Sequence, residues 1–188
     1  MLIVMTGLPG TGKTMLAEAI GMALPAAVVS VDPVEQALWR AGLPRTTSVG
    51  IAAYGVVAAV AEQQLRMGHP VIADAVNAAP AAREVWQALA EGYGCELRVL
   101  EVVCSDEDLH RARVEQRNAA AEQAARHEQT RREQGRPTVT TGLAPVVTWA
   151  QIQRARKAYQ TWPLDRLVLD SAADFEQNVK TSLRMLTA

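Results

Sequence analysis

The sequence lacks an excess of charge of either sign. Its 188 residues carry 19 Lys plus Arg against 20 Asp plus Glu, which leaves a formal net charge of −1. This balance excludes a protein whose whole surface attracts nucleic acid, so such a partner would need a local basic patch. Lysine itself is scarce, because 16 of the 19 cationic residues are Arg. The lysines are Lys13, Lys157 and Lys180.

Long apolar runs are also missing. One long stretch without charge, residues 46–61, contains Thr, Ser and Gly and is shorter than the about 20 apolar residues that a membrane span needs. We expect a buried helix there instead. No basic segment followed by an apolar one precedes the first glycine motif, so we expect a cytoplasmic protein with no membrane partner.

Cysteine is nearly absent. Cys95 and Cys104 flank an apolar segment that is typical of a strand. Nine residues of extended chain separate them by about 30 Å, far beyond the reach of a disulfide, so we expect both to be unpaired. The remaining composition, 49% hydrophobic and 21% charged, is typical of a folded domain and excludes a disordered chain.

Short β-branched segments alternate with longer helical patterns along the chain. The expected strands are 2–6, 27–31, 71–74, 97–103 and 167–169, and the expected helices are 13–24, 33–41, 49–67, 80–91 and 107 to about 133. This alternation predicts an α/β fold with a parallel sheet covered by helices on both faces. Asp32, Ser105 and Thr148 each precede an acid or amide by three residues, as helix N-caps do. No linker divides the chain, so we expect residues 1–188 to form a single domain.

The strongest motif lies between the first strand and the first helix. Residues 7–14 have the sequence GLPGTGKT, which matches the phosphate-binding pattern G-x-x-x-x-G-K-[ST] in the required context. Its glycines allow backbone N–H groups and a helix N-terminus to surround a phosphate. The residues expected to bind the nucleotide are Gly7, Pro9, Gly10, Thr11, Gly12, Lys13 and Thr14. No Asn-Lys-x-Asp guanine motif occurs, so ATP is the expected nucleotide.

Two aspartates follow expected strands, where ligands of open parallel sheets bind. Asp74 ends one strand and is expected, with Thr14, to serve a Mg²⁺ ion; the alternative is a turn-forming Asp. Asp32 is the candidate general base for an acceptor hydroxyl, although it would also suit a helix N-cap. Ala75 follows Asp74 where many P-loop ATPases carry a water-activating Glu, so hydrolysis is not the expected purpose.

An arginine-rich segment follows the fourth strand. Residues 105–136 hold seven Arg and seven acids, and Arg113 and Arg117 share one helical face. Two guanidinium groups on one face can close over a triphosphate and neutralise the charge on a transferring phosphoryl group. The alternative is a solvated helix with Glu to Arg pairs. Residues 135–147 contain two Pro and two Gly, which suits a mobile edge beside the site.

These features together resemble small P-loop kinases of the polynucleotide kinase, zeta toxin and chloramphenicol phosphotransferase group, which have an AAA-type P-loop ATPase domain. The resemblance covers nearly the whole chain. It rests on the segments GLPGTGKT, VIADAVN with Arg83 beyond it, LHRARVEQR, and the late strand LVLD. It implies a three-layer P-loop NTPase fold with strand order 2-3-1-4-5, and a helical lid at about residues 105–147.

The resemblance also implies site roles. The catalytic residues would be Lys13, Asp32, Arg113 and Arg117, and Glu35, Asn77 and Arg83 are tentative substrate-side positions. Glu35 stands where polynucleotide kinases often carry a phosphate-binding Arg, which disfavours a nucleic-acid substrate. We therefore expect an ATP- and Mg²⁺-dependent kinase that phosphorylates a hydroxyl of a small molecule, such as a metabolite, a nucleoside or sugar derivative, or an antibiotic. The alternatives are a polynucleotide 5′-hydroxyl kinase and a P-loop ATPase module without an acceptor. Trp39, Tyr54 and Trp86 would line the acceptor pocket or belong to the core.

Overall fold

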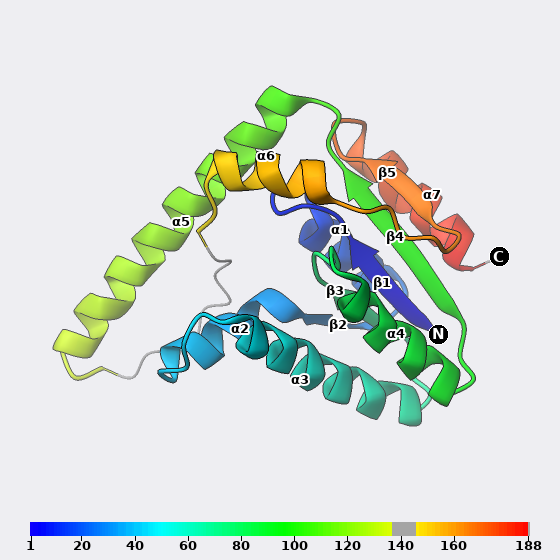
Figure 1. Cartoon of the computed structure of the whole chain (residues 1–188). Helices are drawn as coiled ribbons and strands as arrows, with labels where there is room; N and C mark the ends of the chain where they lie inside the picture. Colours follow the sequence, from blue (N-terminus) through cyan, green and yellow to red (C-terminus); the bar gives the residue numbers. More distant parts are fainter. Residues whose placement is uncertain (137–145, 188) are drawn as a thin grey trace.

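Five parallel strands form the central sheet, in a computed structural model that describes residues 1–136 and 146–187 (Figure 1). The strands are β1 (Leu2–Thr6), β2 (Ala27–Ser30), β3 (Val71–Asp74), β4 (Leu97–Val103) and β5 (Leu167–Asp170). Their order is β2-β3-β1-β4-β5, so the predicted order is confirmed. Because β1 pairs with β3 in the register Met5 to Asp74, the strand-end carboxylate lies beside the turn that follows β1.

Helices cover both faces of the sheet. They are α1 (Lys13–Ala23), α2 (Val31–Arg40), α3 (Thr47–Arg66), α4 (Pro80–Gly92), α5 (Glu107–Glu133), α6 (Trp149–Ala158) and α7 (Phe175–Leu186). Figure 1 shows α1 and α7 on one face and α3 and α4 on the other, while the long α5 projects away from the sheet and α6 crosses its beginning. The sequence patterns predicted five of these helices and a helix after Trp149, but not α7.

The core divides into two clusters because side chains of a strand alternate between faces. Leu2 and Val4 pack with residues of α3 and α4, whereas Ile3 and Met5 pack with residues of α1 and α7. All four side chains are fully buried. Each such burial contributes about 1.5–3 kcal/mol, so the strand that leads into the glycine motif is held firmly from both sides.

The uncharged stretch that begins at Thr46 forms most of α3, but only one face of this helix is buried. Apolar residues recur at every fourth position on the inner face, at Val49, Ala53, Val57, Ala61 and Leu65. Ile51, Val56 and Val60, which lie away from this face, are exposed to solvent. The prediction of a buried helix is therefore correct only for the inner face of α3. Within the described residues, none of the helices combines the length and the hydropathy needed to cross a bilayer.

Two of the three helix N-caps predicted from the sequence differ from those in the structure. Thr148 forms the expected capping box with Gln151. At α5, however, the side chain of Asp106, not Ser105, accepts the hydrogen bond from a first-turn N–H. At α2 the helix begins two residues earlier than expected, with Ser30 in the cap position, so Asp32 lies inside the first turn. The contact recorded for its carboxylate among the described residues is an ion pair with Arg117 and not a capping hydrogen bond. The Asp32 carboxylate is therefore available for another role.

Cys95 and Cys104 are both free, as expected. The stretch of residues 135–147 expected to be a mobile edge lies largely outside the described residues, which omit 137–145.

Candidate functional site

The glycine motif forms a tight loop between β1 and α1. Gly7, Gly10 and Gly12 have φ values of 133°, 84° and 89°, a range that favours glycine over residues with a Cβ. A Cβ on Gly7 would lie 2.2 Å from the carbonyl oxygen of Val102, so only glycine fits against β4. Successive backbone N–H groups in such a loop form an anion-binding hollow at the start of a helix.

Lys13 is the cation of this hollow. Its side chain is buried, and Nζ donates a hydrogen bond to the carbonyl oxygen of Leu8 at 3.0 Å. Burial lowers the pKa of Lys13, and the nearby carboxylates of Asp74 and Asp32 act in the opposite direction. An ammonium group with one backbone contact has donors left for phosphate oxygens.

Asp74 lies opposite the lysine and is oriented by two hydroxyl groups. Thr14 Oγ1 donates to Asp74 Oδ2 at 2.7 Å, and Ser30 Oγ donates to the same oxygen at 3.1 Å. The other oxygen, Oδ1, is buried and has no hydrogen-bond partner among the residues that the structure describes. A buried carboxylate oxygen without a donor is costly, and a hard cation would satisfy it. A carboxylate and a hydroxyl oxygen are ligands that suit Mg²⁺, so these residues fit the ion expected with a nucleotide.

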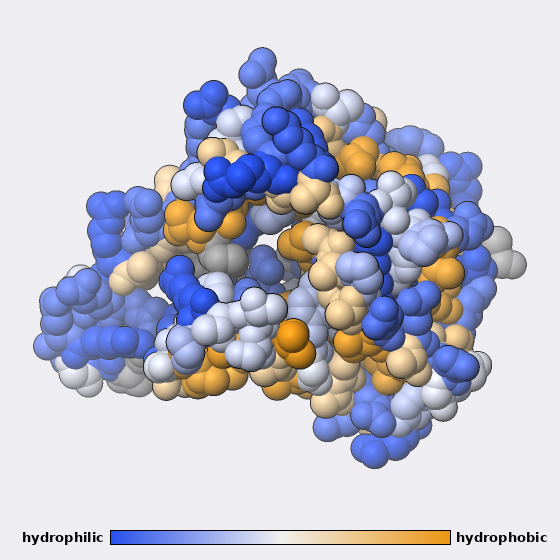
Figure 2. All heavy atoms as spheres, in the orientation of Figure 1, coloured by the Kyte–Doolittle hydropathy of each residue, from blue (hydrophilic) through white to orange (hydrophobic). Residues whose placement is uncertain are grey.

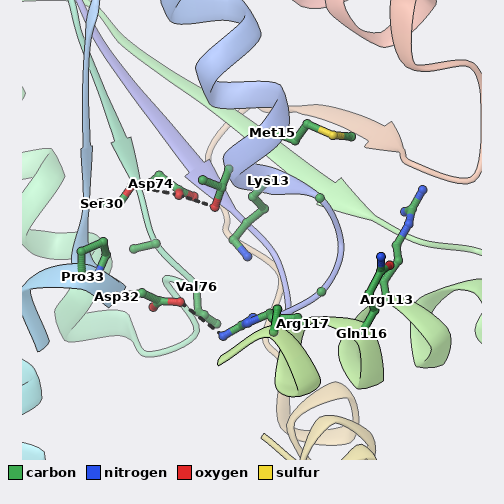
Figure 3. A pocket seen from close by; sticks show the side chains of 15 residues that line it. Lys13, Met15, Ser30, Asp32, Pro33, Asp74, Val76, Arg113, Gln116 and Arg117 are labelled. Atoms are coloured by element: carbon green, nitrogen blue, oxygen red, sulfur yellow. Dashed lines mark hydrogen bonds and ion pairs between the residues drawn. The ribbon is translucent and has the colours of Figure 1, made fainter. Parts of the chain in front are cut away.

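Asp32 and Arg117 face each other across the same space. Figure 3 shows Arg117, from α5, pointing to Asp32 in α2, and Lys13 and Asp74 beside them. The ion pair joins Arg117 Nη2 and Asp32 Oδ2 at 3.6 Å. Burial raises the pKa of the Asp32 carboxyl, although Lys13 and Arg117 lower it. Asp32 is thus a more basic carboxylate than one in water, in contact with a cation.

A cavity of about 620 Å³ joins these groups. Its lining comes from the glycine loop, from the ends of β2 and β3, from the start of α2 and from α5. Figure 2 shows the surface hollowed between α6 and α2. The cavity therefore lies at the carboxyl ends of the strands, where open parallel sheets bind their ligands.

The two lid arginines lie on one helix but bind different parts of the protein. Arg117 reaches Asp32, whereas Arg113 Nη1 and Nη2 donate to Oγ and the carbonyl oxygen of Ser171, at 2.8 and 3.1 Å. Figure 3 shows the two side chains pointing apart. Both line the cavity, so α5 spans it from the α2 side to the loop after β5.

Asn77 and Arg83 lie outside the cavity lining. Asn77 is fully buried with a φ of 52°. Its side chain joins β1 to α4, since Nδ2 donates to the carbonyl oxygen of Met5 and Oδ1 accepts from Trp86 Nε1, both at 2.8 Å. Tyr54 OH accepts the Asn77 backbone N–H at 3.2 Å. The described contacts of Asn77 are those of a structural residue.

Arg83 is also buried, at 4% exposure. Its Nε donates to the carbonyl oxygen of Asn77 at 2.7 Å, and Nη2 donates to that of Gln160. The guanidinium lies between two aromatic rings, 5.7 Å from the centroid of Tyr159 and 5.6 Å from that of Trp162. It therefore ties α4 to the segment that leads into β5.

Arg83→Met is expected to lower the free energy of unfolding by about 2–3 kcal/mol, because it leaves buried carbonyl groups without their charged donor. Urea denaturation of the variant and the wild type measures this loss. Arg154→Met, which changes an exposed arginine of α6, is the matched control and should change little. An Arg83 variant as stable as the wild type would contradict the structural role.

Glu35 also lies outside the cavity lining, one turn beyond Asp32 on α2. Burial and the neighbouring Asp32 raise the pKa of its carboxyl, whereas Arg45 lowers it. A Cβ on Gly50 would lie 3.3 Å from Glu35 Oε1, so the carboxylate rests against α3. Of the three tentative substrate-side residues, it is the one with an electrostatic connection to Asp32.

Two polar lining residues, Ser30 and Gln116, were not predicted from the sequence. Ser30 ends β2 directly opposite Asp74 in the sheet register, and this polar strand end beside a known carboxylate could have indicated it. Gln116 reaches the cavity from α5, but an amide within a charged helix carries no distinguishing pattern. Trp39, Tyr54 and Trp86 do not line the cavity, and Trp86 belongs to the core.

Comparisons with known proteins concern both the sequence and the fold. A family model described as an AAA domain matches residues 2–141. None of the curated proteins matches the sequence.

Solved structures share the fold. A candidate kinase from Chloroflexus aurantiacus is 23% identical with a TM-score of 0.70, over 97% of this chain and 96% of that chain. Kti12 of Chaetomium thermophilum, in complex with ADP-AlF3, is 17% identical with a TM-score of 0.67, over 99% and 97%. The Mycobacterium tuberculosis APS kinase CysC, in complex with AMPPNP and APS, is 18% identical with a TM-score of 0.65, over 100% and 97%. At these identities the similarity concerns the fold.

Proposed function

The chain belongs to the AAA-domain family, and from this premise we propose that it is an ATP- and Mg²⁺-dependent kinase that phosphorylates a hydroxyl of a small molecule. The observation that carries the proposal is the position of Asp32. This carboxylate lines the same cavity as Lys13 and the glycine loop, and it is free of the capping hydrogen bond that its sequence context favours.

The phosphate end of the site would be formed by the glycine loop, Lys13 and the lid arginines. Backbone N–H groups and the Lys13 ammonium would bind the β- and γ-phosphates. Thr14 and Asp74 would hold Mg²⁺, which neutralises phosphate charge when it is bound. The free Asp74 Oδ1 supports this assignment, because no protein group satisfies it among the described residues. Arg117 would stabilise the negative charge of the transferring phosphoryl group.

The transfer step would use Asp32 as the general base. The acceptor O–H proton passes to the Asp32 carboxylate while the acceptor oxygen forms a bond to the γ-phosphorus. The bond from the γ-phosphorus to the β,γ-bridging oxygen breaks, and ADP leaves with that oxygen. The raised pKa of Asp32 favours this role, since a more basic carboxylate takes a proton more readily at neutral pH.

Transfer to an acceptor is favoured over hydrolysis. Asp32 and Asp74 are the acidic residues of the cavity lining, and the residue after Asp74 is the buried Ala75. No lining carboxylate follows the Mg²⁺-side aspartate to orient a water molecule. A cavity of about 620 Å³ is within the usual size of small-molecule sites, and a kinase of similar fold was crystallised with APS, a small molecule.

An acceptor screen with γ-labelled ATP tests the proposal. We expect label on a small hydroxyl compound from a panel of nucleosides, sugars, sugar derivatives and antibiotics, at a rate well above that of ATP hydrolysis without acceptor. A 5′-hydroxyl oligonucleotide belongs in the panel, because label on it alone would replace the small molecule with a polynucleotide. ATP hydrolysis that no acceptor accelerates would contradict a kinase and favour an ATPase module.

A further inference from the structure

A series of side-chain contacts connects the glycine loop to α5 and α6. It includes none of the residues proposed above to bind the acceptor or the metal ion. Its centre is His110, which lies in the first turn of α5 and is 1% exposed. The ring Nε2 lies 2.8 Å from the carbonyl oxygen of Pro9, and Nδ1 lies 2.9 Å from Arg156 Nη2. Arg156 continues the chain, since its Nη1 is 3.7 Å from Glu107 Oε2. One buried imidazole thus contacts both the phosphate-binding loop and α6.

The partners of His110 define its protonation state. A carbonyl oxygen only accepts, so Nε2 carries the hydrogen that it donates to Pro9. A guanidinium only donates, so Nδ1 must be the unprotonated acceptor. Burial lowers the pKa of His110, and the cations Arg156, Lys13 and Arg113 add to this effect, although the Pro9 hydrogen bond opposes it. The ring is therefore held as the neutral tautomer with one donor aimed at the loop.

Packing leaves His110 little freedom. The Trp149 ring meets it edge-on at a centroid distance of 5.2 Å, and the Arg156 guanidinium lies 5.6 Å from the centroid of the same Trp149 ring. On the loop side, a Cβ on Gly10 would lie 2.5 Å from Val114 Cγ2 and 3.3 Å from the His110 ring. The first turns of α5 therefore rest directly on the glycine loop.

The glycine loop packs closely on α5 at Gly10 but borders an open space at Leu8 and Thr11. A second cavity, of about 370 Å³, is lined by Leu8, Thr11, His110, Arg156 and Tyr159 among others. Glycine-rich backbone beside an open space has several conformations available. The hydrogen bond from His110 to Pro9 thus restrains the loop in addition to the packing at Gly10.

We propose that His110 is a positioning residue that holds the glycine loop in its phosphate-binding conformation and aligns it with Arg113 and Arg117. The three side chains lie within about two turns of one helix, so the contact that anchors the helix to the loop also places both arginines over it. The inference rests on the proposed nucleotide site, but not on the identity of the acceptor. Nucleotide binding alone is enough to test it.

The decisive experiment compares two replacements of this histidine. His110→Leu keeps an apolar volume but removes the donor to Pro9, and we expect the dissociation constant for a fluorescent ATP analogue to rise about 10-fold or more. His110→Gln keeps an N–H donor of similar reach, and we expect affinity within about 3-fold of the wild type. Rescue by Gln separates the donated hydrogen bond from bulk packing. His127→Gln changes an exposed histidine on the same helix and should leave affinity unchanged.

Arg156→Met provides a second variant that leaves the histidine in place. It removes the group that holds Nδ1 as an acceptor, so the ring is free to take the other tautomer, and we expect an intermediate loss of about 5-fold. Circular dichroism and thermal unfolding are recorded for every variant, and if His110→Leu does not fold, the comparison of Arg156→Met with His110→Gln decides. Unchanged affinity in His110→Leu, or equal losses in the Leu and Gln variants, would overturn this inference alone. A wild type that binds no nucleotide would overturn it together with the proposed function.

Discussion

Lys13→Ala is expected to reduce phosphoryl transfer from ATP by about 1000-fold or more, since it removes the cation that we propose binds the phosphates, where charge moves in the transition state. The loss should appear in kcat as well as in nucleotide affinity. Lys13 is buried near Asp74 and Asp32, and it is the lysine of the cavity lining among the described residues. Steady-state kinetics with the acceptor found in the screen, and titration with a fluorescent ATP analogue, measure the two effects separately.

The matched control for this prediction is Lys157→Ala, which removes an exposed lysine from α6. It should leave both transfer and affinity within about 2-fold of the wild type, because an isolated surface charge contributes little. Lys13→Ala also leaves the Leu8 carbonyl without its donor, so its folding is compared with that of the wild type by thermal unfolding. A folded Lys13→Ala protein with near-normal transfer would exclude the glycine loop as the catalytic phosphate site.

Asp32→Asn is expected to lower transfer by about 100- to 10,000-fold, which is the range that a positioned general base contributes. ATP affinity should change by less than about 5-fold, because the Asp32 carboxylate pairs with Arg117 among the described residues and, in the proposed mechanism, serves the acceptor and not the nucleotide. The amide has the size of the carboxylate but cannot take the acceptor proton. Single-turnover measurements with the labelled acceptor separate the chemical step from nucleotide binding.

The stability of Asp32→Asn follows from the direction of its pKa shift. Burial raises the pKa of Asp32 in the folded protein, so the folded state resists loss of this proton and the ionised carboxylate opposes folding above the ordinary pKa of about 3.9. Replacing it with a neutral amide should therefore not destabilise the protein at neutral pH. Asp165→Asn, at an exposed position before β5, is the control. Full transfer activity in Asp32→Asn would contradict the base assignment.

The elements of the fold were predictable because their causes are local. Short runs of apolar, largely β-branched residues define the strands, and the four-residue recurrence of apolar positions in α3 defines its inner face. The helix α7 escaped prediction although its N-cap, Asp174, accepts a first-turn hydrogen bond. Its apolar face is short, and it is buried only because α7 packs with α1 on one side of the sheet. A contact between segments so distant in the sequence leaves no local pattern.

Whether a candidate site residue could be predicted depended on how far along the chain its interaction partners lie. The glycine loop was predictable, since the eight residues of its motif largely determine its backbone conformation between a strand and a helix. The orientation of Arg83 was not, because its partners Asn77 and Gln160 lie 6 and 77 residues away along the chain. The same holds for His110, whose contacts with Pro9 and Arg156 span 101 and 46 residues.

The sequence by itself therefore determined the α/β class, the position of the phosphate loop and the strand-end aspartates, all of which depend on short-range patterns. The tertiary structure alone decided which way each side chain faces. Because α2 begins at Val31, Asp32 lies in the first turn of the helix and faces the cavity, where the sequence had also suggested a helix cap. Arg113 and Arg117 lie on one face of α5, yet Arg113 contacts Ser171 and Arg117 contacts Asp32. The physical reason is that such orientations depend on the packing of segments that meet only when the sheet and its helices have assembled.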